Sequence, residues 1–237
     1  MTYCLGMKVK TGLVAIADTR LTSGTETTTA KKYFIHRSEK HSIFLLTSGL
    51  RSIRDKGLTY FREVIEEEHG FTKLYEAVNA LGEQIRRVAK EDKASLEESG
   101  LEFNLHAIIG GQFEGDKEHR LFLLYPQGNW IEVSQGSPFV IVGNSGYGKP
   151  ILRRTLGYDA SMRFALKTGY LSFDSTRVSA NDVDFPIDII IYNRDSFEIK
   201  VHRLTEADMA SVSKQWGDLL RDSINQIPEE WMGGIFE

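Results

Sequence analysis

The sequence predicts an α+β fold in which antiparallel sheets are covered by helices, and two features of the chain support this prediction. Segments with strand character come in hairpin-connected blocks, and the helices between these blocks come in pairs. This order is typical of antiparallel sheets rather than of alternating βαβ units. Because the chain has two sets of apolar strands and two sets of helices, we expect a sandwich of two sheets with the helices outside.

The first half of the chain begins with strands and then changes to a helical period. Strands are expected at 5–9, 12–18, 33–36 and 42–47, with a loop at 19–31. A helix is expected at 51–68. A second helix begins near Leu74 and ends before Gly100, because apolar residues recur at helical spacing at Leu74, Val78, Leu81, Ile85 and Val88.

Strands return in the second half of the chain, at 105–109, 121–125, 130–133, 139–142, 187–192 and 198–203. Shorter helices are expected at 149–156 and 160–170, and Thr205 is the candidate N-cap of the last helix. No linker or repeat divides the chain, so residues 1–237 are expected to form one domain with a short C-terminal tail at 226–237. Trp231 and Phe236 in this tail are expected to be docked rather than free, because they are large and apolar.

Composition argues against several classes of function. A net charge of −4 does not favour a nucleic-acid partner, which usually requires a basic stripe. No signal peptide and no apolar stretch long enough to span a bilayer is visible, so no membrane association is expected and a cytoplasmic location is the default. Cys4 is the only cysteine, which excludes an internal disulfide.

Two further patterns argue against a metal or cofactor. The six histidines show no spacing typical of metal ligands. The segment from Gly143 to Lys149 nearly matches a phosphate-binding loop, but Pro150 stands where that loop needs Ser or Thr to hold magnesium. Because Pro is favoured in the first turn of a helix, this segment is interpreted as a glycine turn followed by a helix start, and no cofactor is expected.

Thr2 is the residue whose type and position most clearly suggest a role in catalysis. Thr is small enough for removal of Met1, which would leave a hydroxyl and a free α-amine on one residue. That amine has an ordinary pKa of about 7.7–8.0, so it can act as a base near neutral pH. A threonine hydroxyl activated by its own amine is a known type of nucleophile.

Further motifs follow in an order that resembles the proteasome-type N-terminal nucleophile hydrolases, and most of all their bacterial subfamily Anbu. The motifs are Ala15 to Arg20 at the end of a strand, Lys31 to Ile35 at the start of one, and Leu45 to Gly49 before the first helix. The resemblance covers roughly residues 2–225. It implies a four-layer αββα sandwich and assembly into a homo-oligomer, either a ring or an open spiral.

The resemblance assigns catalytic roles that suit the residue types. Asp18 would be costly to bury alone and should hold a cation, for which Lys32 is our choice and Lys31 the competitor. A nearby ammonium lowers the effective pKa of the Thr2 hydroxyl. The amide of Gly49 is implied as an oxyanion-hole donor, because no side chain blocks its approach to the scissile carbonyl.

Two further positions are implied as support for the Thr2 amine. Asp174, followed by Ser175, resembles the supporting Asp-Ser pair of these hydrolases. Gly146 falls where many relatives carry Ser, so Ser145 is the candidate substitute. Tyr3 also replaces the more usual small residue after the nucleophile.

The sequence therefore predicts an N-terminal threonine hydrolase that cleaves amide bonds through an acyl-enzyme, with a peptide or unfolded protein as substrate. Two alternatives remain open. One is a catalytically silent scaffold subunit of the same fold, although such subunits typically lack the Thr, Asp and Lys set that this chain has. The other is amidohydrolase or acylase chemistry on a small amide.

Overall fold

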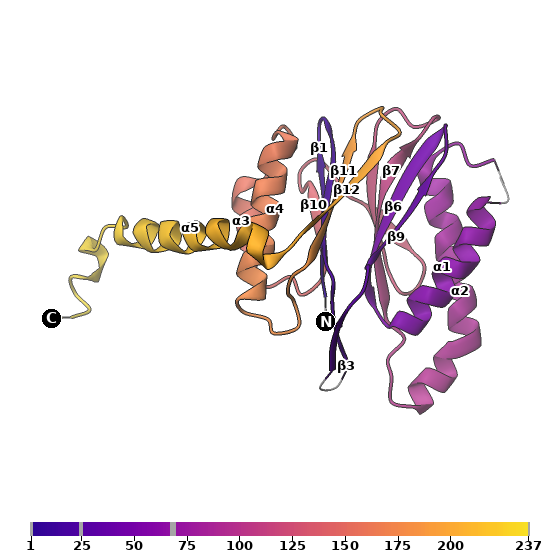
Figure 1. The fold of residues 1–237 in the computed structure, drawn as a ribbon, viewed down its shortest axis with the longest axis horizontal. Helices are drawn as coiled ribbons and strands as arrows, with labels where there is room; N and C mark the ends of the chain where they lie inside the picture. The colour runs from indigo at the N-terminus through magenta and orange to yellow at the C-terminus, as the bar shows by residue number, and fades with distance from the viewer. Residues whose placement is uncertain (1, 24–25, 67–69, 237) are drawn as a thin grey trace.

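Two five-stranded antiparallel sheets stack face to face between two layers of helices (Figure 1). The computed structural model describes residues 2–23, 26–66 and 70–236. The first sheet has the order β10-β1-β2-β11-β12, with bounds Phe139–Gly143, Tyr3–Val9, Gly12–Asp18, Ile187–Asn193 and Ile199–Leu204. The second has the order β5-β6-β7-β8-β9, with bounds Tyr33–Arg37, His41–Gly49, Leu105–Phe113, Arg120–Leu124 and Trp130–Glu132. The four-layer αββα sandwich is thus confirmed.

The helices divide between the two outer faces. The second sheet is covered by α1 (Arg51–Glu66) and α2 (Leu74–Glu98), and the first by α3 (Lys149–Thr155) and α4 (Met162–Arg177) (Figure 1). Three apolar cores result, one under each helical layer and one between the sheets. Because side chains alternate along a strand, β1 sends Tyr3 and Leu5 toward the helices and Cys4 toward the opposite sheet. Thr2 and Lys8 share the direction of Cys4, at opposite ends of the strand.

Several elements differ from the sequence-based expectation. The expected loop at 19–31 instead contains a short hairpin, β3 (Arg20–Ser23) and β4 (Glu26–Thr29). Its Thr-rich strands lack the apolar alternation that would have indicated a strand. The first helix ends at Glu66 in the described residues, and its expected continuation at 67–68 lies outside them. The helix expected at 160–170 extends to Arg177, so Asp174 lies on a helix.

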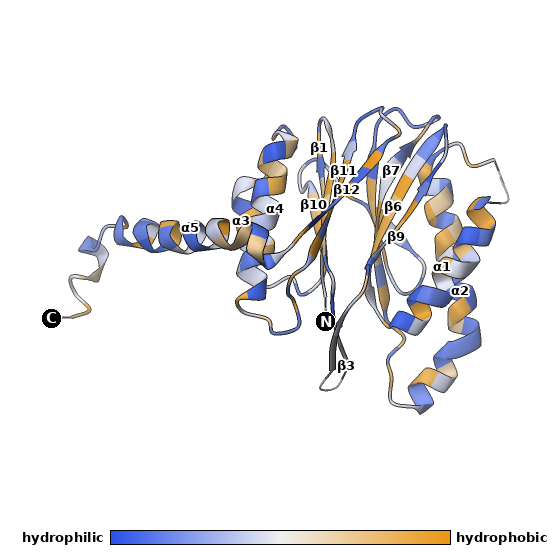
Figure 2. Cartoon of the chain, viewed as in Figure 1, coloured by the Kyte–Doolittle hydropathy of each residue, from blue (hydrophilic) through white to orange (hydrophobic). Residues whose placement is uncertain are grey.

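The last helix, α5 (Glu206–Asn225), projects away from the sandwich (Figure 1). Its expected N-cap is confirmed, since the Thr205 hydroxyl accepts a hydrogen bond from the Asp208 backbone N–H. The helix buries none of its residues, and apolar and polar residues are mixed along it (Figure 2). A short 3-10 helix, η1 (Glu230–Met232), follows. The expected docking of the tail is wrong for the single chain, because Trp231 is 66% and Phe236 84% exposed.

The described residues form no helix that is both long and apolar enough to cross a membrane.

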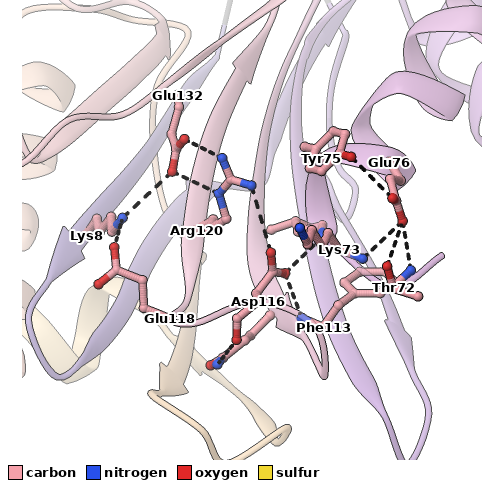
Figure 3. Close-up of polar contacts among 12 residues, drawn as sticks. Lys8, Thr72, Lys73, Tyr75, Glu76, Phe113, Asp116, Glu118, Arg120 and Glu132 are labelled. Atoms are coloured by element: carbon pink, nitrogen blue, oxygen red, sulfur yellow. Dashed lines mark hydrogen bonds and ion pairs between the residues drawn. The ribbon is translucent and has the colours of Figure 1, made fainter.

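At the end of β1 opposite Thr2, an ionic network joins the two sheets (Figure 3). Lys8 is buried, and its ammonium lies 3.0 Å from a carboxylate oxygen of Glu118 and 3.9 Å from one of Glu132. Glu132 also pairs with Arg120, and the buried carboxylate of Asp116 accepts hydrogen bonds from the backbone N–H groups of Phe113 and Leu74. This network fixes the far end of the sandwich and ties α2 to the second sheet.

The Lys8 network gives a stability prediction. Glu118→Gln removes the closer counter-charge of a buried ammonium, and we expect it to lower the free energy of unfolding by about 1–3 kcal/mol. The control is Glu198→Gln, since Glu198 belongs to an exposed ion pair with Lys200 at 3.7 Å and its loss should change stability by less than about 0.5 kcal/mol. Urea denaturation measures both. Equal effects of the two substitutions would contradict the account.

Candidate active site

Asp18 is the centre of a buried polar cluster at the Thr2 end of the sandwich. It is the last residue of β2, and its side chain is fully buried. Its Oδ1 accepts a hydrogen bond from the Thr2 hydroxyl at 2.9 Å and another from the Tyr3 backbone N–H at 2.8 Å. The Lys32 ammonium lies 2.8 Å from each carboxylate oxygen. The structure therefore brings Thr2, Asp18 and Lys32 together, with Thr2 and Lys32 sharing one oxygen of Asp18.

Lys32 reaches this cluster because its backbone is held by the second sheet. It directly precedes β5, and its carbonyl accepts a hydrogen bond from the Thr47 backbone N–H on β6 at 3.0 Å. Its side chain is 3% exposed. Lys31 points elsewhere, with its ammonium 5.8 Å from the centre of the Tyr33 ring. Of the two lysines weighed from the sequence, Lys32 is the one that contacts Asp18.

The electrostatics of the cluster are set by burial. Burial raises the pKa of the Asp18 carboxyl, while the Lys32 ammonium and the hydrogen bonds from Tyr3 and Thr2 oppose the shift. Burial also raises the pKa of the neighbouring Cys4 thiol to about 12, so this thiol is neutral at ordinary pH and plays an apolar packing role.

Thr2 is held through its backbone as well as its hydroxyl. Its carbonyl accepts a hydrogen bond from the Asn144 N–H at 2.7 Å, just after β10, the strand that pairs with β1. Gly143 adopts φ +88°, and a Cβ built there would lie 2.0 Å from the Thr2 carbonyl oxygen. Glycine is thus required at 143 both by the backbone conformation and by the close approach of Thr2.

Gly49 ends β6, the strand whose Thr47 holds Lys32. Its φ is +135°, and a Cβ there would lie 2.1 Å from the carbonyl oxygen of Asn104. The same Asn104 oxygen accepts a hydrogen bond from the Leu50 N–H at 2.9 Å. Gly49 is therefore needed for the close packing of this turn, and its role as an oxyanion-hole donor stays a prediction.

The other two expected site residues are not joined to the cluster by side-chain contacts. In the described chain, no hydrogen bond links the Ser145 hydroxyl to Thr2, although Ser145 directly follows Asn144. Asp174 has different partners, because its Oδ1 accepts hydrogen bonds from Arg177 at 2.9 Å and from the Ser213 hydroxyl of α5 at 2.7 Å. Its carboxylate anchors α5 to α4, so these contacts do not support the expected role of Asp174 beside the Thr2 amine.

Backbone groups complete the site, and residue types alone do not indicate them. The sequence distinguishes Tyr3 only by its size, yet the Tyr3 backbone N–H donates a hydrogen bond to Asp18. Gly143 and Asn144 are recognisable from the sequence only as part of a glycine-rich turn. The signal that could have identified them is the position of this turn directly after a strand, since such turns often hold functional groups. Among the described residues, no group of three or more His, Cys, Asp or Glu side chains could hold a metal ion.

The fold and this cluster define the class of the protein. Two antiparallel sheets between helical layers, with Thr2 at the start of the first strand facing Asp18 and Lys32, form a proteasome β-subunit-like N-terminal nucleophile fold.

Comparison with solved structures identifies the family within this class. An Anbu (Gly-1) mutant from Hyphomicrobium sp. strain MC1 is 32% identical with a TM-score of 0.88, over 97% of this chain and 99% of that one. Anbu (ancestral beta-subunit) from Yersinia bercovieri is 30% identical with a TM-score of 0.87, over 95% and 97% of the two chains. A helical assembly of the Anbu complex from Pseudomonas aeruginosa is 29% identical with a TM-score of 0.89, over 96% and 97%. The chain belongs to the Anbu family. No family model and no curated protein sequence matches it.

The close approach at Gly143 gives a prediction for the site. Gly143→Ala forces Cβ against the Thr2 carbonyl at a positive φ, so we expect it to lower the free energy of unfolding by about 1–3 kcal/mol and to displace Thr2. Gly146→Ala in the same turn is the control, because a Cβ there has no heavy atom within 4 Å. Thermal unfolding compares the two, and an equal tolerance of both changes would contradict the packing described here.

Proposed function

We propose that this protein is an N-terminal threonine hydrolase that cleaves amide bonds of peptides or unfolded chains after removal of Met1. The observation that carries the proposal is the buried contact set in which the Thr2 hydroxyl and the Lys32 ammonium share one oxygen of Asp18. A purely structural threonine would not need a buried carboxylate and a buried ammonium beside its hydroxyl, since burying such charges is costly.

The first half of the reaction is acylation of Thr2. The free α-amine of Thr2 takes the hydroxyl proton as Oγ1 attacks the substrate carbonyl carbon. The nearby Lys32 ammonium stabilises the negative charge that develops on Oγ1, and Asp18 holds both groups in place. The Gly49 N–H is the proposed donor to the carbonyl oxygen. When the C–N bond breaks, the leaving nitrogen takes this proton from the Thr2 α-ammonium, and an ester remains on Oγ1.

The second half releases the product. A water molecule gives a proton to the Thr2 amine and attacks the ester carbon, the C–O bond to Thr2 breaks, and the proton returns to Oγ1. A catalytically silent scaffold subunit would not need this arrangement of Thr2, Asp18 and Lys32. Small amides remain an alternative substrate class, and comparing the turnover of a peptide library with that of small amides distinguishes the two.

The catalytic set gives a mutational prediction. Thr2→Ala and Lys32→Ala should each lower kcat/KM by at least about 10³-fold, and the double variant should lose little more because the groups act as a unit. Lys31→Ala is the matched control and should retain activity, because the Lys31 ammonium lies over the Tyr33 ring. Peptide hydrolysis by folded variants is the measurement. Clear additivity, or a damaging Lys31→Ala, would contradict these roles.

Processing gives a second prediction. The active form should begin at Thr2, because only then does the hydroxyl share a residue with a free amine. Intact mass should show the loss of one Met, and activity should rise with the processed fraction. Full activity in a preparation that retains Met1 throughout would rule out the amine as the base.

We further propose that the protein is a homo-oligomer, in a ring or an open spiral. The support is the far half of α5, which exposes Leu219, Leu220 and Ile224, together with the exposed Trp231 and Phe236. An apolar surface of this kind is typical of an interface. A related Anbu complex from Pseudomonas aeruginosa is described as a helical assembly. A head-to-tail contact that misses closure gives such a helix, whereas one that closes gives a ring.

Sedimentation at micromolar concentration tests the assembly. The protein should sediment as a species larger than a dimer, and Leu220→Glu should shift it toward smaller species because it places a charge in the apolar surface. Lys214→Glu, at an exposed position of the same helix outside this apolar set, is the control and should leave the size unchanged. A monomer peak for the unsubstituted protein would contradict the proposal.

A further inference from the structure

Tyr3, the residue after the proposed nucleophile, is anchored to α4 by its side chain. Its ring lies in the apolar core under α4. There the Tyr3 hydroxyl forms a hydrogen bond with the hydroxyl of Ser172 at 2.7 Å, and both residues are fully buried. The ring also meets Phe173 edge to face, with 5.9 Å between the ring centres. Tyr3 therefore binds Asp18 through its backbone N–H and α4 through its side chain.

Ser172 also contacts the turn that holds the backbone of Thr2. The Thr2 carbonyl accepts a hydrogen bond from the Asn144 N–H at 2.7 Å, and the turn that begins there ends at Gly148, the N-cap of α3. A Cβ at Gly148 would lie 2.2 Å from the Ser172 hydroxyl oxygen and 2.3 Å from the Ser172 carbonyl oxygen, so this glycine packs directly on Ser172. Thr2 is thus held from two directions, by Tyr3 and by the turn, and both supports end at Ser172.

The hydrogen bond between the two hydroxyls fixes direction more than it adds stability. A phenylalanine at position 3 could bury the same ring in the same core, and the net contribution of a hydrogen bond between neutral groups to stability is modest. An apolar contact allows the ring to slide, whereas a short and directional hydrogen bond fixes the ring relative to α4. Burial raises the pKa of the Tyr3 phenol, so this group stays neutral and takes no part in proton transfer.

We propose that Tyr3 and Ser172 are positioning residues, and that the hydrogen bond between their hydroxyls sets where the Thr2 hydroxyl lies relative to Asp18. This inference rests on the proposed hydrolase function. Both side chains are fully buried, so they act through the backbone of residues 2 and 3 rather than by touching the substrate. A displacement of about 1 Å at a reacting group can lower a rate roughly 100-fold.

The main test compares Tyr3→Phe with a matched control, Tyr192→Phe. Tyr192 is also fully buried and its hydroxyl donates to Gln112 at 3.0 Å, but it lies on β11 at the end of the sandwich opposite Thr2. Tyr3→Phe should lower kcat for peptide hydrolysis roughly 10- to 100-fold and leave KM and the shape of the pH–rate profile unchanged, whereas Tyr192→Phe should change kcat by less than about twofold. Equal effects of the two substitutions, or a change in KM alone, would overturn the inference.

Ser172→Ala tests whether the two residues act as a pair. It removes the other partner of the same hydrogen bond, so it should lower kcat to a similar extent. The double variant Tyr3→Phe/Ser172→Ala should then lose little more than either single variant, because the interaction can be lost only once. Losses that add fully in the double variant would contradict the proposed pair.

A measurement that needs no turnover separates this inference from the hydrolase itself. The backbone N–H of residue 3 is bound to Asp18, and its hydrogen exchange can be followed by NMR. Exchange should be at least about tenfold faster in Tyr3→Phe and Ser172→Ala than in the unsubstituted protein, and unchanged in Tyr192→Phe. This result without hydrolysis of any peptide would retain the positioning role and reject the hydrolase. Unchanged exchange in Tyr3→Phe would overturn the inference, whether or not kcat falls.

Discussion

The buried carboxylate of Asp18 is the constraint on which the site depends. A fully buried carboxylate is tolerated only when charge and hydrogen bonds compensate it. Here the compensation comes from three parts of the chain: the Lys32 ammonium just before β5, the Tyr3 N–H at the start of β1 and the Thr2 hydroxyl beside it. Since the Lys32 carbonyl is bound by the second sheet and Asp18 belongs to the first, satisfying this carboxylate also fixes how the two sheets meet at this end.

The two ends of β1 are held in place by different kinds of contact. Thr2 and Lys8 project from the same face of the strand into the space between the sheets. At the Lys8 end, the buried ammonium is bound by Glu118 on the loop before β8, and side chains close the sandwich (Figure 3). At the Thr2 end, the backbone N–H of Asn144 and the closely approaching Gly143 hold Thr2, which is 5% exposed. The two ends of β1 are therefore held by different means, by ion pairs at Lys8 and by backbone contacts at Thr2.

The sequence predicted the fold class, most strands and helices, and the contact of Asp18 with Lys32. These predictions depend on apolar periodicity and on the order of motifs, both of which are local properties of the chain. The hairpin after β2 was not predicted, because its Thr-rich strands have little apolar alternation. Asp174 was placed beside Thr2 by resemblance, yet its carboxylate holds α5 through Ser213, a partner 39 positions away.

Other features were missed because they arise from the tertiary fold. The Tyr3 N–H and the Asn144 N–H are backbone groups, and residue type does not reveal where they point. The tail carries Trp231 and Phe236, whose apolar character predicted docking, and both side chains are exposed in the part of the chain that the structure describes.

The most direct test of the account is to map the covalent intermediate. Processed protein would be incubated with an activated ester or β-lactone that acylates hydroxyl nucleophiles, and then digested and analysed by mass spectrometry. The account predicts one acyl group, on the Oγ1 of Thr2, and its absence in Lys32→Ala under the same conditions. Acylation at another residue, or equal labelling of Thr2 in folded and denatured protein, would contradict the claim that Asp18 and Lys32 make Thr2 the nucleophile.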